Sequence, residues 1–96
     1  MAKKVIWKYK PRLVSHFRLK MPVGAQILAF RNQRGEPCIW AMVDPEAKME
    51  SRLFRMVGTG HKEVEANFHY IGTELFDLFD NDSLAMHLFE VLPSNE

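Results

Sequence analysis

The chain has 96 residues, 47% of them hydrophobic and 11% aromatic, as expected for one globular domain spanning residues 1–96. The single cysteine, Cys38, excludes an internal disulfide, and no apolar run approaches the roughly 20 residues of a membrane helix. We therefore expect a soluble intracellular protein. The formal net charge of +1 conceals an asymmetry: residues 1–36 carry nine Lys and Arg against one acid, and residues 37–96 carry four against eleven. This division indicates either a basic binding face or two surfaces that attract each other.

The first third of the chain predicts three strands, at Val5–Lys10, His16–Met21 and Ala25–Phe30. The first two alternate apolar and basic residues, which is the pattern of a half-buried strand. In the first strand this alternation directs the rings of Trp7 and Tyr9 toward the core and the neighbouring lysines toward water. A glycine-containing segment at residues 32–35 then predicts a hairpin turn into the next strand.

The chain is organised around the stretch Pro37–His61, which reads as two buried strands joined by a polar loop. Cys38–Val43 is apolar at every position, so it predicts a central strand covered on both faces, with Trp40 largely buried. Arg52–Val57 predicts the return strand. Gly58–His61 ends it, because two closely spaced glycines adopt positive φ without steric cost.

The last third predicts two more strands, at Phe68–Thr73 and Leu84–Leu92. Between them, residues 74–80 are ambiguous: the apolar residues have helical spacing, yet the run is short, so a short helical turn stays open here. About seven short strands with turn residues between them indicate an all-β fold, a single small antiparallel sandwich or barrel. The connections are mostly of hairpin length, which favours antiparallel order.

The most specific local motif is Gly58-Thr59-Gly60-His61. Backbone N–H groups in such a turn can cradle an anion, although the motif lacks the ending of a P-loop and the third glycine of a dinucleotide fingerprint. An ordinary strand-ending turn therefore stays open beside a ligand site. Phe54–Thr59 and Phe68–Thr73 share an aromatic-x-x-apolar-Gly-Thr pattern, which would bring two strand ends to one rim if the strands were neighbours. The candidate ligand-binding residues are therefore Arg55, Gly58, Thr59, Gly60, His61, Tyr70 and Thr73.

No catalytic or metal-binding set assembles along the chain. The histidines are scattered, the lone cysteine completes no zinc set, and only His69 and His87 are placed to approach each other across a sheet. Asp77–Asp82 lacks the central glycine and distal glutamate of a calcium loop. We therefore expect no enzyme, no metal and no cofactor. A small phosphoryl-transfer or hydrolytic enzyme that uses His61 is the least favoured reading.

Several motifs, taken in order, resemble a family of small proteins of unknown function found mainly in bacteriophages and prophages. They include Trp7-Lys8-Tyr9, Val43-Asp44-Pro45, Gly58-Thr59-Gly60-His61 and Tyr70-Ile71-Gly72-Thr73. The resemblance covers nearly the whole chain, but the segment 74–83 is longer and more aromatic than the family's usual turn. It implies a phage-related origin, and hence the cytoplasm of a bacterial host, and it offers no catalytic residues to transfer.

The resemblance favours a non-enzymatic binding protein that blocks host defence machinery. It would act either by binding a host protein or by sequestering a nucleotide-like anionic signal. The alternative is a nucleic-acid-associated module that uses the basic N-terminal third, although no recognition helix or stacking stripe accompanies it and specific DNA binding is not expected. Many apolar strand residues in a short chain and opposite charges in its two halves favour a homo-oligomer, a dimer above all. No membrane partner is expected.

Overall fold

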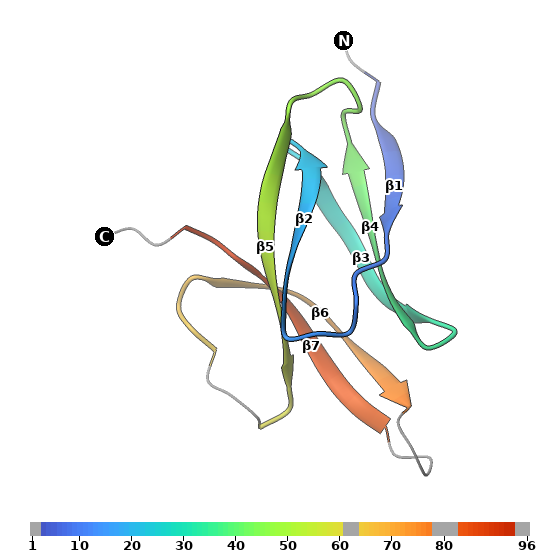
Figure 1. The fold of residues 1–96 in the computed structure, drawn as a ribbon, viewed down its shortest axis with the longest axis vertical. Helices are drawn as coiled ribbons and strands as arrows, with labels where there is room; N and C mark the ends of the chain where they lie inside the picture. Colours follow the sequence, from blue (N-terminus) through green and yellow to red (C-terminus); the bar gives the residue numbers. More distant parts are fainter. Residues whose placement is uncertain (1–2, 61–63, 78–82, 94–96) are drawn as a thin grey trace.

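Seven antiparallel strands in two sheets make up the fold (Figure 1). The structure is a computed structural model, and it describes residues 3–60, 64–77 and 83–93. Within these ranges no segment is helical, so none could cross a membrane as a helix. The strands are β1 (Val5–Tyr9), β2 (His16–Pro22), β3 (Gln26–Gln33), β4 (Glu36–Val43), β5 (Met49–Gly58), β6 (Phe68–Asp77) and β7 (Ser83–Val91).

The strand order is β1-β4-β3 in one sheet and β2-β5-β7-β6 in the other. This confirms the predicted all-β, antiparallel sandwich. Among the described strands only β3–β4 and β6–β7 are both consecutive and paired. The chain instead changes sheet after β1, β2 and β4. Short connections between strands thus link opposite layers as well as neighbours in one sheet.

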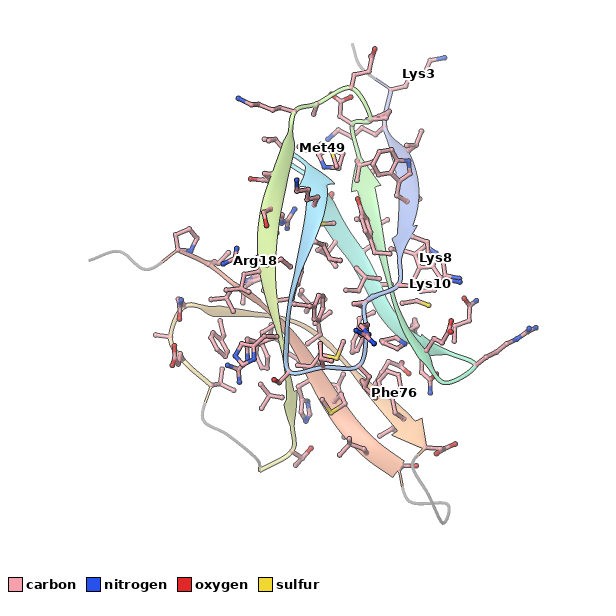
Figure 2. The ribbon with its side chains drawn as sticks, in the orientation of Figure 1. Lys3, Lys8, Lys10, Arg18, Met49 and Phe76 are labelled. Atoms are coloured by element: carbon pink, nitrogen blue, oxygen red, sulfur yellow. The ribbon has the colours of Figure 1, made fainter. Side chains whose placement is uncertain are left out.

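The sandwich has two sides where the edge strands of its sheets lie next to each other, and these sides differ in charge and in how closely the edge strands approach. On one side β3 and β6 come together, where Arg31 pairs with Glu74 at 3.5 Å and Asn32 Nδ2 donates to the Leu75 carbonyl oxygen at 2.8 Å. The other side is formed by β1, β2 and the segment between them, and residues 3–22 hold seven Lys and Arg and no acid. Figure 2 labels Lys3, Lys8, Lys10 and Arg18 along these strands. Residues 3–22 therefore make the β1–β2 side of the sandwich basic, whereas Arg31 of the same basic third lies on the β3–β6 side.

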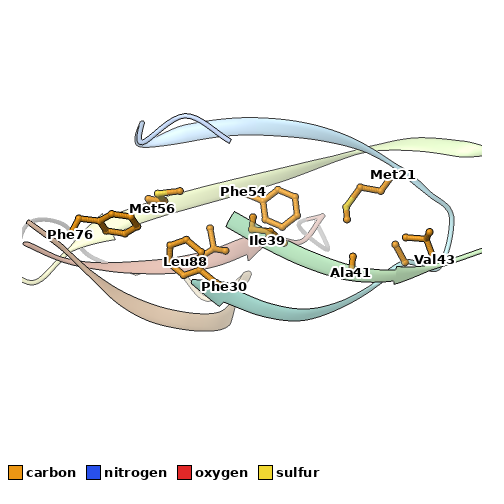
Figure 3. Packing of buried hydrophobic residues seen from close by; sticks show 10 residues of the cluster. Met21, Phe30, Ile39, Ala41, Val43, Phe54, Met56, Phe76 and Leu88 are labelled. Atoms are coloured by element: carbon orange, nitrogen blue, oxygen red, sulfur yellow. The ribbon is translucent and has the colours of Figure 1, made fainter. Parts of the chain in front are cut away.

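Apolar side chains from both sheets fill the space between the layers (Figure 3). Phe54, Met56 and Leu88 enter from the four-stranded sheet. Ile39, Ala41 and Val43 enter from β4 at every second position, as the period of a strand requires. The remaining buried members of the core are Met21, Ala25, Phe30 and Phe76.

The strand β4 lies in the middle of its sheet, as predicted, but it is not covered on both faces. Cys38, Trp40 and Met42 point away from the core, and no second layer lies over them among the described residues. Cys38 is nonetheless buried, as predicted, and Trp40 is partly buried, with the Nζ of Lys8 5.5 Å from its ring centroid. Long cationic side chains can shield apolar surface in this way because only the charged tip needs water.

The ambiguous segment after Thr73 is strand as far as the structure describes it. Residues 74–77 continue β6 and pair with residues 83–86 of β7, so the suggested helical turn is wrong for this part. The side chains alternate, with Phe76 2% exposed and Leu75 57% exposed. In the pairing with β7, the N–H and C=O groups of alternate residues form hydrogen bonds to the neighbouring strand. A single helical turn of four residues would leave most of its N–H and C=O groups without a partner inside the turn. The rest of the suggested turn, at residues 78–80, lies outside the described residues.

Candidate functional site

Four residues form a row across the outer face of the four-stranded sheet. His16 on β2 lies opposite Arg55 on β5, Arg55 lies opposite Phe89 on β7, and Phe89 lies opposite Tyr70 on β6. Their chain neighbours Phe54 and Leu88 point into the core, so alternation turns this row outward. With strands spaced about 4.8 Å apart, the row spans about 14 Å. We call these four residues the cross-strand row.

Arg55 is the half-buried cation of this row, and its surroundings fix its position. Its guanidinium carbon lies 5.6 Å from the centroid of the Phe68 ring, and Nη1 lies 2.6 Å from His16 Nε2. Its Nε is buried and has no hydrogen-bond partner among the described residues, and no described carboxylate pairs with it. A cleft of about 580 Å³ borders Arg55, and its lining also includes residues 13–15 and core-facing side chains such as Met56 and Met86. The fold therefore holds a partly buried cation without a matching anion among the described residues.

The contact with Arg55 fixes the hydrogen-bonding role of His16. A guanidinium group can only donate, so Nε2 of His16 must accept and the imidazole is neutral in this contact. The ring proton then lies on Nδ1, which is 2.9 Å from the Ser15 hydroxyl oxygen and donates to it. The backbone of Ser15 also anchors this segment, because its carbonyl oxygen accepts from the Met56 N–H at 3.0 Å.

Aromatic rings occupy the other half of the cross-strand row. The Phe89 centroid lies 5.8 Å from that of Phe68 and 5.5 Å from that of Tyr70, the latter in an edge-to-face arrangement. Phe89 is 8% exposed although it points outward, because these rings cover it. Tyr70 is 54% exposed, so it presents an aromatic surface to solvent. Such a surface can stack on a planar ligand.

A chain of hydrogen bonds runs beside the row across β5, β7 and β6. Thr59 Oγ1 lies 2.8 Å from His87 Nε2, and His87 Nδ1 lies 2.8 Å from Thr73 Oγ1. Thr73 Oγ1 also lies 2.6 Å from the Tyr70 hydroxyl. A hydroxyl against an imidazole has the form of a nucleophile and its base. However, a neutral threonine occupies the place of the orienting carboxylate, so this chain positions Tyr70 and Thr59 more readily than it activates a nucleophile.

The structure brings four of the seven candidate residues, Arg55, Thr59, Tyr70 and Thr73, to one outer face. Gly58 instead lies buried at the end of β5, opposite Met86. Gly60 is exposed in the following turn, and its φ of 70° explains the glycine there. His61 lies outside the described residues.

The suggested rim of two neighbouring Gly-Thr strand ends does not form. The strand β7 separates β5 from β6, and β6 continues past Gly72 to Asp77. His87 instead bridges the two threonines from β7, and sequence reasoning missed this role. His69 and His87 do not meet: their partners in the β6–β7 register, Glu90 and Thr73, place them on different rungs.

Other candidate features contribute little to a site. Trp7 and Tyr9 pack against the core, as the alternation predicted, so their rings do not form a stacking platform. No group of three or more potential metal ligands occurs in the described part of the chain. The three-stranded sheet also has a cation over an aromatic ring, because Lys8 on β1 lies over Trp40 on β4. The outer face of the four-stranded sheet is thus the best-developed candidate.

The fold and this face define a small antiparallel β-sandwich that carries a row of cationic and aromatic side chains. The family model described as a domain of unknown function (DUF7352) matches residues 2–96, and the chain belongs to this family. A search of curated proteins finds no match, and neither does a search of solved structures.

Proposed function

We propose that this protein is a non-enzymatic binding protein whose ligand is a small nucleotide-like anion. The ligand would lie along the cross-strand row, with its phosphate at Arg55 and its base against Tyr70. Arg55 and Tyr70 lie two strand spacings apart, about 10 Å, which leaves room for one sugar-phosphate unit between them.

The observation that carries this proposal is the isolation of Arg55. A partly buried charge is costly unless an opposite charge or hydrogen bonds compensate it. Here a ring and a neutral imidazole hold the guanidinium, its Nε has no partner, and no described carboxylate neutralises it. A bound phosphate would supply that compensation, because arginine presents a planar fork of donors that matches it.

The biological context of this binding is a further part of the proposal. The motif resemblance suggests a phage-related protein. Such a protein could remove an anionic signal of host defence by binding alone, because sequestration needs no catalytic groups. Blocking of a host protein is the alternative within the same class. A nucleic-acid module is less well supported, because Trp7 and Tyr9 pack against the core instead of facing the lysines.

Calorimetry with a panel of linear and cyclic nucleotides tests the proposal. We expect Arg55→Met to weaken binding at least about tenfold, because hydrogen bonds to charged groups contribute about 1.5–3 kcal/mol. Tyr70→Leu should weaken it by about tenfold, since stacking of one base contributes about 1–3 kcal/mol. Arg31→Met is the matched control, because its exposed guanidinium lies on the β3–β6 side.

The outcomes separate the versions of the proposal. Binding that is lost in Arg55→Met and Tyr70→Leu and kept in Arg31→Met supports the row as the site. Loss in His61→Ala alone would move the site to the turn after β5. If no nucleotide binds the wild-type protein, the small-ligand version is wrong and a protein target becomes the working hypothesis.

A further inference from the structure

We propose that His16, Arg18 and Arg55 form a site for a tetrahedral oxyanion, and that His16 takes up a proton when the anion binds. This inference rests on the proposed function, because the site would hold the phosphate of the same ligand. It adds Arg18 to the recognition of that ligand and assigns His16 of the cross-strand row a proton that is taken up with it. The chemistry applies equally to a phosphate ester, free phosphate and sulfate.

The first step of the argument is that the observed contact requires a neutral imidazole. Arg55 Nη1 donates to His16 Nε2 at 2.6 Å, and His16 Nδ1 donates to Ser15 Oγ at 2.9 Å. A proton added at Nε2 would place two N–H donors against each other at this distance. The Arg55–His16 contact and a protonated His16 are therefore mutually exclusive unless an acceptor lies between them.

The second step is the charge around His16. Arg18 follows two residues later on the same strand face, and Arg55 faces His16 from β5. Lys10 and Arg12, from the segment before β2, line a cleft of about 480 Å³ together with His16 and Arg18. These charged groups are all cations, and no described acid lines this cleft. An anion in this cleft therefore meets only cations among the charged groups that line it.

The third step is that there is room for the anion. His16 and Arg18 line one cleft and Arg55 borders another, and Val14 lines both. An oxyanion placed over His16, between Arg18 and Arg55, can accept hydrogen bonds from both guanidinium groups and from a protonated Nε2. Anion binding and protonation of His16 then favour each other, and by linkage the effect is reciprocal.

Sulfate is the probe that tests this linkage, because its charge does not change between about pH 5 and 8, the range in which histidines titrate. Calorimetry at about pH 5.5 and about pH 8 should show sulfate binding roughly tenfold tighter at the lower pH, as expected for coupling to one proton. Titrations in two buffers with different ionisation enthalpies should show proton uptake, and the imidazole resonances of His16 should change on addition of sulfate at neutral pH.

In His16→Gln the amide oxygen replaces Nε2 as acceptor but does not titrate. This variant should bind sulfate with the same affinity at both pH values, and His69→Gln, an exposed position on β6, should behave as wild type.

Each outcome decides between specific alternatives. Equal sulfate affinity at both pH values in wild type, or a pH dependence that persists in His16→Gln, overturns the proton linkage. If nucleotides bind but sulfate does not compete with them, the oxyanion site lies elsewhere, although the proposed function survives. If neither sulfate nor any nucleotide binds, both proposals fail.

Discussion

The ion pair between Arg52 and Glu90 gives the sharpest test of what stabilises the sandwich. Arg52 Nε and Nη2 donate to the two carboxylate oxygens of Glu90 at 2.6 and 2.7 Å, and Nη1 donates to the Ala25 carbonyl oxygen at 2.6 Å. The side chains are only 16% and 12% exposed. Hydrogen bonding to Glu90 raises the pKa of Arg52 above its ordinary value, so the guanidinium stays charged at every practical pH. The pair thereby connects β5, β7 and the start of β3.

The expected cost of breaking this pair follows from its burial. Glu90→Gln removes the negative charge and leaves the largely buried Arg52 without its paired carboxylate. Removal of one partner of a buried pair costs about 3–5 kcal/mol, and the partial exposure places this one at about 3 kcal/mol. Replacing both residues, as Arg52→Met with Glu90→Leu, should cost less than either single change, because no uncompensated charge remains.

Urea denaturation followed by tryptophan fluorescence provides the measurement, with Trp7 and Trp40 as probes. The control is Glu74→Gln, because Glu74 pairs with Arg31 at 3.5 Å across a surface where Arg31 is 71% exposed. We expect this control to lose less than about 1 kcal/mol. The reasoning fails if Glu90→Gln costs no more than the control, or if the double variant is less stable than both single variants.

Three further predictions concern stability and assembly. Tyr9→Phe should be at least as stable as wild type and up to about 1 kcal/mol more stable, because the buried Tyr9 hydroxyl has no described partner. Burial raises the pKa of Tyr9 above 10.0, and Arg52 opposes this shift. Because ionised Tyr9 is disfavoured in the folded state, wild type should lose stability relative to the variant as the pH rises above 10. Melting curves above and below pH 10 would contradict this if the variant and wild type lost stability in parallel. Phe54→Ala should cost about 3–5 kcal/mol and Trp40→Ala less, since Phe54 is 0% exposed and Trp40 is only partly buried, and equal denaturation midpoints would refute the ranking. Light scattering should give the mass of a dimer at micromolar concentration, and a monomer mass at every concentration would reject self-association.

The sequence predicts the strands well because alternation and turn residues are local signals. Residues 5–9 and 16–22 are strands close to their predicted bounds. The prediction fails where the signal depends on what covers a strand. Trp40 belongs to an entirely apolar run, but whether a second layer lies over it depends on the arrangement of the sheets. The helical spacing at residues 74–77 likewise yields to pairing with β7, which no local pattern reveals.

The candidate site shows the same division between local and distant signals. Arg55 and Thr59 share a face by simple parity along one strand, and this is readable from sequence. Tyr70 and Thr73 are three residues apart and would point to opposite faces, but an irregularity in the register between Tyr70 and Gly72 lets them hydrogen-bond. His16 contacts Arg55 from 39 residues away, and this contact follows only from the pairing of β2 with β5. Such register between distant strands is not encoded in any single stretch of sequence.

The most direct test of the central claim is to observe Arg55 itself during a nucleotide titration. Side-chain Nε–Hε resonances of ¹⁵N-labelled protein report on each arginine, and the buried Nε of Arg55 should give a distinct signal. On addition of a mononucleotide we expect this resonance and the ring resonances of Tyr70 to shift together and to saturate at one ligand per chain, while the Arg31 signal stays in place. Shifts confined to other arginines, or no shift at Arg55 at saturating nucleotide, would contradict the assignment of the outer face of the four-stranded sheet as the binding surface.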